Sequence, residues 1–236
     1  MGEEARSKVP AEFQTQFPHY GNPPTLFLAI TRYVQRLLHH NEEHHQVSGG
    51  QKVMMGGSVS DGNTEQLRTM HLDNITMARA WLESVYPKLK LNWEWFRKLQ
   101  KGHIQRFGRH ADNDEAYRWR GRTPEHCLTS GLDDYPRGEP PNVGELHADL
   151  LAWMAFATRM LKDISSHLGP KYAEDVDEYT RIEKNMLDNL DALHWNEEHQ
   201  IYCDQTVEGG KSYISIYLII RTKKKNTSLI INGADG

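Results

Sequence analysis

The sequence predicts an all-α fold, and two features support this prediction. Apolar residues recur at intervals of three and four, the period of a helix with one buried face, in stretches that cover residues 25–37, 65–99, 148–167 and 172–193. No strand pattern separates these stretches from one another, which favours helices packed on helices. With 236 residues, the chain is long enough to form one large domain.

Proline and glycine set the expected ends of these helices. Pro23 and Pro24 precede the first, with Thr25 near its cap. Pro87 lies inside the second, which we expect to be one long kinked helix or a broken pair. Gly169 and the proline after it end the third helix and separate it from the fourth.

The composition excludes several kinds of protein. The formal net charge is only −4, so no nucleic-acid partner and no anionic membrane surface is indicated. No window approaches the roughly 20 apolar residues of a membrane helix, and we expect no membrane segment in this chain. No cofactor is expected. The two cysteines, Cys127 and Cys203, are too few for a disulfide framework, although a single bridge between them remains an alternative.

A histidine-rich run contains His40, Glu43 and His44 in the spacing of the inverted zinc-peptidase motif. On a helix, the two histidines share a face and could hold a metal with a third ligand. The run is low in complexity, leads into a glycine-rich segment at residues 48–62 and lacks apolar neighbours that exclude water. We therefore interpret it as a polar helix end followed by a flexible loop and predict no metal site.

Acidic, guanidinium and aromatic side chains concentrate in residues 117–153. Asp133 and Asp134 lie there in a loop segment with Gly131 and Pro136. Because the two aspartates are adjacent, their side chains point in different directions, and we assign chemistry to one and structure to the other. One interpretation is a cap for a helix that begins near Val143, or the end of a turn. The other is a carboxylic acid at the rim of a cavity.

The side chains around this loop suit a sugar. Trp119 offers an apolar face, while Arg118, Arg120 and Arg137 offer many hydrogen-bond donors. Glu145 and Asp149 are four residues apart, so a helix would place them on one face about a turn apart. This carboxylate pair is either a repulsive pair on a solvated face or a hydroxyl-binding pair that lines a pocket.

Two runs in this stretch resemble glycoside hydrolase family 63, the family of processing α-glucosidase I. The first reads Ser-Gly-Leu-Asp-Asp-Tyr-Pro-Arg from Ser130 to Arg137, and the second reads Glu-x-His-x-Asp-Leu-x-x-Trp from Glu145 to Trp153. Shorter matches extend the resemblance over roughly residues 1–205. It implies an (α/α)₆ toroid, of which this chain would form part. Residues 1–210 would be the N-terminal part of the catalytic domain, and residues 211–236 a divergent, disordered tail.

The resemblance also implies a reaction. A mannosyl-oligosaccharide glucosidase of N-glycan processing removes the terminal α-linked glucose with inversion, so the implied partner is a glucosylated N-linked oligosaccharide. Asp133 matches the general acid of the family, which protonates the leaving oxygen while a second carboxylate activates water. That second carboxylate is a Glu in the last third of the family's catalytic domain, so we expect this chain to be an incomplete fragment.

The predicted substrate-binding residues are Arg118, Trp119, Arg120, Arg137, Glu145, Asp149 and Asn22, the last from an Asn-Pro-Pro loop of the kind found near the family's pocket. The resemblance implies the lumen of the endoplasmic reticulum, with which the sequons at Asn74 and Asn226 are compatible. The alternative from another functional class is a non-catalytic carbohydrate-binding or assembly fragment.

Overall fold

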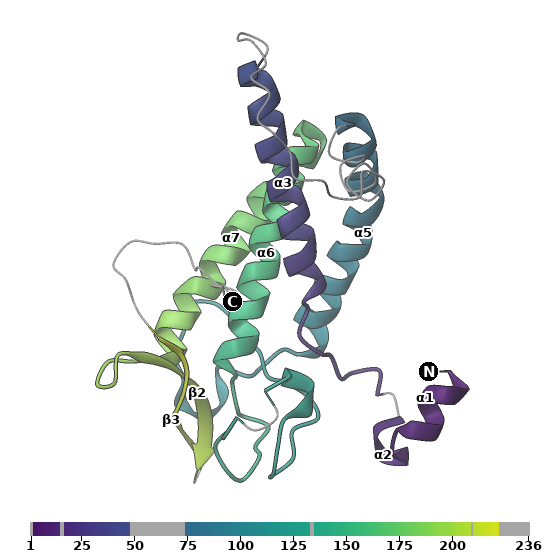
Figure 1. Cartoon of the computed structure of the whole chain (residues 1–236). Helices are drawn as coiled ribbons and strands as arrows, with labels where there is room; N and C mark the ends of the chain where they lie inside the picture. Colours follow the sequence, from purple (N-terminus) through teal and green to yellow (C-terminus); the bar gives the residue numbers. More distant parts are fainter. Residues whose placement is uncertain (1, 15–16, 48–73, 133–134, 209, 222–236) are drawn as a thin grey trace, which may run out of the picture. The chain divides into compact units, whose positions relative to one another are not determined.

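The computed structural model describes residues 2–14, 17–47, 74–132, 135–208 and 210–221. Most of the regular structure is helical, which confirms the all-α class and agrees with part of an (α/α)₆ toroid (Figure 1). The long helices are α3 (Leu26–Val47), α5 (Ile75–Leu99), α6 (Ala148–Leu168) and α7 (Ala173–Asn189). Two short helices, α1 (Glu3–Lys8) and α2 (Ala11–Gln14), precede them.

The helix boundaries agree with the sequence pattern wherever the described residues test them. Helix α5 is a single helix with Pro87 inside it, and the predicted part before Ile75 lies largely outside the described residues. Helix α7 continues into a π-helical turn, η4 (Leu190–His194). Helix α6 begins at Ala148, which confirms the helix predicted over residues 148–167, whereas the interpretation of a helix that begins near Val143 is wrong.

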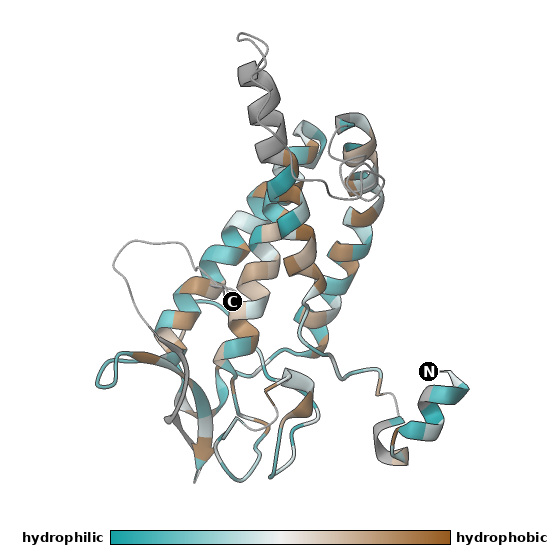
Figure 2. Cartoon of the chain, viewed as in Figure 1, coloured by the Kyte–Doolittle hydropathy of each residue, from teal (hydrophilic) through white to brown (hydrophobic). Residues whose placement is uncertain are grey.

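The chain forms two compact units, and helices build the one that contains residues 24–93 and 157–181. Brown apolar positions alternate with teal polar ones along these helices, as Figure 2 shows. Trp93 of α5 donates its indole N–H to Thr158 of α6 at 2.8 Å, and the rings of Tyr33 and Trp81 meet at 4.8 Å. The apolar stripes read from the sequence therefore form this core.

The other unit contains residues 1–23, 94–156 and 182–236. It combines loops and a small sheet with α1, α2 and one end each of α5, α6 and α7. The sheet is antiparallel, in the order β1 (Trp195–Asn196), β2 (Ile201–Glu208) and β3 (Lys211–Arg221). Strand β3 lies within the segment predicted to be a disordered tail, and it pairs with β2 across the expected boundary at residue 210. Residues 211–221 are thus a strand, whereas the rest of that segment lies outside the described residues.

Short bridges between extended segments organise this second unit. Lys101 pairs with Tyr117, and Leu146 pairs with Gln205 of β2 through hydrogen bonds of 2.9 and 3.1 Å. Gly102 permits the close approach, because a Cβ atom there would lie 2.2 Å from Leu146 Cδ2. These bridges bring residues near 118, 146 and 204 side by side although they are far apart in the sequence.

The structure bears on the expectations about a membrane segment and about the two cysteines. Within the described ranges, no helix is both long enough and apolar enough to cross a membrane. Cys127 and Cys203 are buried free thiols, so the alternative of a disulfide bridge between them is wrong.

Candidate active site

Arg137, Asp149 and Asp204 form a buried ionic cluster, which we call the Arg137 cluster. The guanidinium contacts Asp204 Oδ2 at 2.5 Å and Asp149 Oδ2 at 2.9 Å. Trp119 donates its indole N–H to Asp149 at 2.9 Å. The other oxygen of Asp204 accepts the backbone N–H of Ala148 at 2.9 Å, and so caps the first turn of α6. Nearly every charged atom of this cluster therefore has a partner.

Burial acts on the ionisable groups of the Arg137 cluster. It raises the pKa of Asp204 to about 6, although Arg137 and the Ala148 N–H both favour the charged carboxylate. Burial also disfavours the charge on Arg137, but Asp204 and Asp149 outweigh it and raise the pKa of the guanidinium. The ion pairs of Arg137 and the cap from Asp204 therefore stabilise the fold around the start of α6.

Glu145, Arg122, His147 and Arg118 form a second group, which we call the Glu145 cluster. Arg122 Nε lies 3.0 Å from Glu145 Oε1, and both side chains are 2% exposed. His147 Nδ1 accepts the backbone N–H of Trp119 at 2.9 Å, so its proton is on Nε2. That nitrogen lies 3.5 Å from Glu145 Oε2. Residues 118–122 and the neighbouring His147 thus direct polar groups at one carboxyl group.

Two pKa values in this cluster, those of Glu145 and His147, are shifted towards the neutral forms. Burial raises the pKa of Glu145 to about 7, while Arg122 and Arg118 act in the opposite direction. Burial, helped by the nearby charge of Arg137, lowers the pKa of His147 well below its usual value. At neutral pH, Glu145 therefore exists in both protonation states and can donate or accept a hydrogen bond, while His147 stays neutral.

The Glu145 cluster leaves hydrogen bonds unmade. Its atoms without a hydrogen-bond partner in the described part of the chain are Arg118 Nε, Arg122 Nε, both carboxyl oxygens of Glu145 and His147 Nε2. The 3.0 Å approach of Arg122 to Glu145 is an ion pair without hydrogen-bond geometry. Buried polar atoms in proteins nearly always have partners. Hydroxyl groups or water molecules, which both donate and accept, suit this mixture of donors and acceptors.

The structure separates residues that the sequence grouped together. Glu145 and Asp149 do not share a helix face, because α6 begins between them at Ala148, and that prediction is wrong. They are both buried but belong to different clusters. The ring of Trp119 is fully buried and faces Asp149 rather than solvent, so it offers no exposed face to a sugar.

The other predicted site residues differ in where the structure places them. Asp133, the predicted general acid, and its neighbour Asp134 lie outside the described residues. Arg118 and Arg120 are half-buried, and Arg137 is buried within its cluster. Asn22 is exposed and makes no hydrogen bond to either cluster in the described ranges, so its predicted role stays a prediction.

Arg122, His147 and Asp204 are site residues that the sequence analysis missed. Arg122 could have been found, because it continues the arginine-rich run after Trp119. His147 could also have been found, because it lies in the second motif between the carboxylates of Glu145 and Asp149. Asp204 gave no local signal, since the hydrogen bonds between Leu146 and Gln205 bring it to the site.

Comparison with known proteins defines the class of this molecule. The chain matches the glycosyl hydrolase family 63 C-terminal domain over residues 1–230, and it belongs to that family. It is 44% identical over 209 residues to the probable mannosyl-oligosaccharide glucosidase of Schizosaccharomyces pombe. It is 38% identical over 223 residues to the mannosyl-oligosaccharide glucosidase of Saccharomyces cerevisiae. Each alignment covers 88% of this chain and 25% of the relative, so the chain spans about a quarter of their length.

Plant relatives are more distant. The chain is 31% identical over 214 residues to the mannosyl-oligosaccharide glucosidase GCS1 of Arabidopsis thaliana, of which it covers 21%. It is 28% identical over 214 residues to alpha-glucosidase 2 of the same plant, of which it covers 22%. The resemblance stated from the two motifs is therefore confirmed at the level of the family.

Proposed function

We propose that this chain carries part of the active site of an α-glucosidase of N-glycan processing. The reaction is removal of the terminal α-linked glucose from a mannosyl-oligosaccharide with inversion, in the lumen of the endoplasmic reticulum. Membership of family 63 and the names of the yeast relatives support the reaction class. Asp133 would protonate the leaving oxygen, as its position in the first motif implies.

The observation that carries this proposal is the unsatisfied Glu145 cluster. A glucose residue presents several hydroxyl groups, each able to donate one hydrogen bond and accept others. Glu145 would bind such hydroxyls in either protonation state, and the neutral His147 would fix its orientation. Arg118 and Arg122 add donors beside the carboxyl group. The Arg137 cluster would hold the start of α6 beneath them.

Hydrolysis of a glucosylated N-glycan by a family 63 catalytic domain that carries this chain together with the second carboxylate tests the catalytic role. There we expect β-glucose as the first product by NMR, and loss of turnover in the Asp133→Asn variant. The exposed Asp177→Asn is the matched control, because it makes the same chemical change on the surface of α7. Turnover that persists in Asp133→Asn would contradict the role of Asp133.

Isothermal titration with the same glycan tests the binding role separately. We expect Glu145→Gln to weaken binding about tenfold, since a hydrogen bond to a charged group is lost. A folded chain that neither binds nor cleaves the glycan would contradict the proposal. Binding without turnover by the catalytic domain that carries both carboxylates would favour the non-catalytic carbohydrate-binding alternative.

A further inference from the structure

A pocket of about 510 Å³ opens beside residues 118–122, within the unit of loops and sheet. Four of its lining side chains are cationic, namely Lys98, Arg118, Arg120 and Arg122. No acidic residue is among the described residues that line it. Such a concentration of positive charge in a concave site attracts anions.

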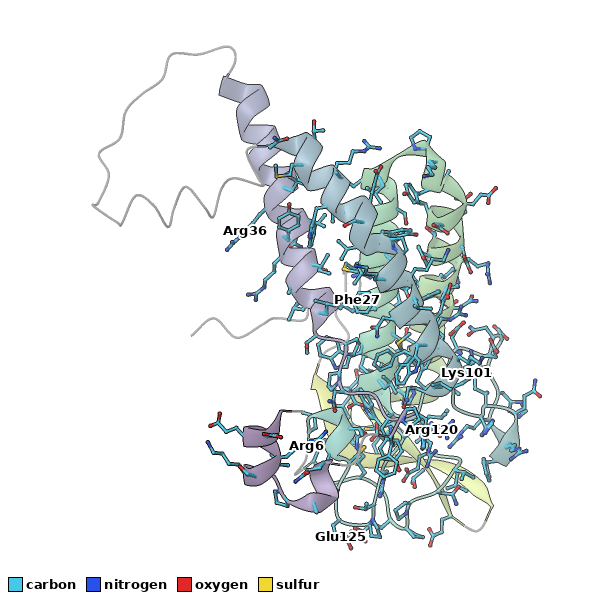
Figure 3. All side chains as sticks on the ribbon, turned by 90° about the vertical axis from the view of Figure 1, so that its right-hand side faces the viewer. Arg6, Phe27, Arg36, Lys101, Arg120 and Glu125 are labelled. Atoms are coloured by element: carbon cyan, nitrogen blue, oxygen red, sulfur yellow. The ribbon has the colours of Figure 1, made fainter. Side chains whose placement is uncertain are left out.

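Hydrogen bonds to neutral backbone groups hold two of these cations in place. Arg120 donates to the carbonyl oxygens of Leu99 at 3.0 Å and Lys101 at 3.3 Å. Arg122 donates to the carbonyl oxygen of Gly138. Because carbonyl groups carry no net charge, these bonds orient the guanidinium groups without neutralising them. Arg120 is labelled in Figure 3, among the crowded side chains of this unit.

The positive charge of the pocket is only partly compensated. Arg122 has an ion pair with Glu145, whereas Lys98, Arg118 and Arg120 form none within the described residues. The Nε atom of Arg118 is buried and has no hydrogen-bond partner there. Burial lowers the pKa of Arg118, and the charge of Arg120 lowers it further. A bound anion would relieve this repulsion between neighbouring guanidinium groups.

Aromatic rings form another side of the pocket. Tyr20 packs closely on Gly121, where a Cβ atom would lie 2.8 Å from its ring and where φ is +83°. The ring of His19 meets that of Tyr20 edge-on at 4.7 Å. The volume exceeds what a single small anion needs, and these rings provide a surface for an organic group attached to it.

We propose that this pocket binds a phosphate-class oxyanion, carried as a phosphate monoester on a small polar molecule. Arginine matches phosphate well, because its planar fork can donate two parallel hydrogen bonds to phosphate oxygens. The site shares Arg118 and Arg122 with the proposed sugar site but goes beyond the proposed hydrolysis, since a neutral glucosyl residue does not require the additional charges of Lys98 and Arg120. Free inorganic phosphate shares the same chemistry and is the other source of such a ligand.

Isothermal titration calorimetry at constant ionic strength tests this site, with inorganic phosphate, glycerol 3-phosphate and glycerol as probes. We expect saturable binding of both phosphates and none of glycerol. Tighter binding of glycerol 3-phosphate would identify an esterified phosphate as the ligand, and equal binding would identify free phosphate. A chain that shows no saturable binding of either phosphate would overturn the proposal.

Variants assign the binding to the pocket. We expect Arg118→Gln and Lys98→Gln each to weaken phosphate binding about tenfold, because each removes a charged donor. Arg36→Gln is the control, since Arg36 is exposed and points away from α3 (Figure 3). Lys98 is also exposed, so its variant tests the site without disturbing buried structure. Equal affinities in all three variants would overturn the proposal. No readout depends on glucose release, so this outcome is independent of the α-glucosidase proposal.

Discussion

The Arg137 cluster and the Glu145 cluster are neighbours in sequence but differ in how completely their buried charges are paired. Arg137 has a carboxylate at each terminal nitrogen, and the carboxylates accept further N–H groups. Glu145 has three cationic or N–H groups around it and no hydrogen bond to either oxygen within the described residues. A satisfied cluster stabilises a fold, whereas an unsatisfied one is suited to a ligand. We therefore assign a structural role to the Arg137 cluster and a ligand-binding role to the Glu145 cluster.

The largest expected effect is the loss of a partner from the Arg137 cluster. Asp204→Ala should lower the free energy of unfolding by about 3–5 kcal/mol, because it removes one of the two carboxylates that pair with the buried Arg137 and also the acceptor that caps α6. Urea denaturation measures this change. The control is Lys184→Ala, which breaks the exposed pair with Asp188 and should cost at most about 0.5 kcal/mol. Equal effects of the two variants would show that the Arg137 cluster is not a structural centre.

The second prediction concerns pH and Glu145. Its pKa rises from 4.5 in the unfolded chain to about 7 in the folded chain, so the folded state holds the proton more tightly. This contribution to stability is fully present below pH 4.5 and is lost as the pH rises through 7. It amounts to at most about 3 kcal/mol.

Glu145→Gln should remove that dependence. Urea denaturation from pH 4.5 to 8 measures the unfolding free energies of wild type and variant. As the pH rises, wild type should steadily lose stability relative to the variant. A difference that stays constant over this range would mean that Glu145 titrates normally and that its cluster is better solvated than the structure shows.

A smaller effect is expected for Trp119→Phe. The change keeps an aromatic ring in the buried site but removes the N–H donated to Asp149, which should cost about 2 kcal/mol. Thermal and urea unfolding measure the loss. Trp153→Phe is the control, because its indole N–H makes no hydrogen bond in the described part of the chain. Similar losses in both variants would argue against the bond from Trp119 to Asp149.

The fourth prediction involves no change in stability. His147 should stay neutral, with its proton on Nε2, because burial disfavours the imidazolium and Nδ1 accepts the Trp119 N–H. The ring ¹⁵N shifts of His147 should therefore remain constant from pH 6.5 to 8. A titration midpoint within that range would show that a charge on His147 is tolerated and that the pairing with Glu145 is ionic.

The fold was largely predictable where burial follows a local period. Leu82, Leu89 and Trp93 are buried on α5 as their spacing indicated. Strand β2 was missed because its buried residues include Asp204, Gln205 and Thr206, so apolar and polar residues do not alternate along it. The pattern that identifies a strand was absent, although each of these polar side chains is buried.

The sequence by itself determined the helical stripes, the family and the two motifs that contain Asp133, Glu145 and Asp149. These depend on residue types at fixed local spacings. Only the tertiary structure decided that Asp204 caps α6, that Trp119 lies buried and that Glu145 and Asp149 belong to separate clusters. The reason is physical. The charge state of a buried group depends on its partners, and here those partners come from distant segments that the bonds of Leu146 with Gln205 and of His147 with Tyr117 bring together.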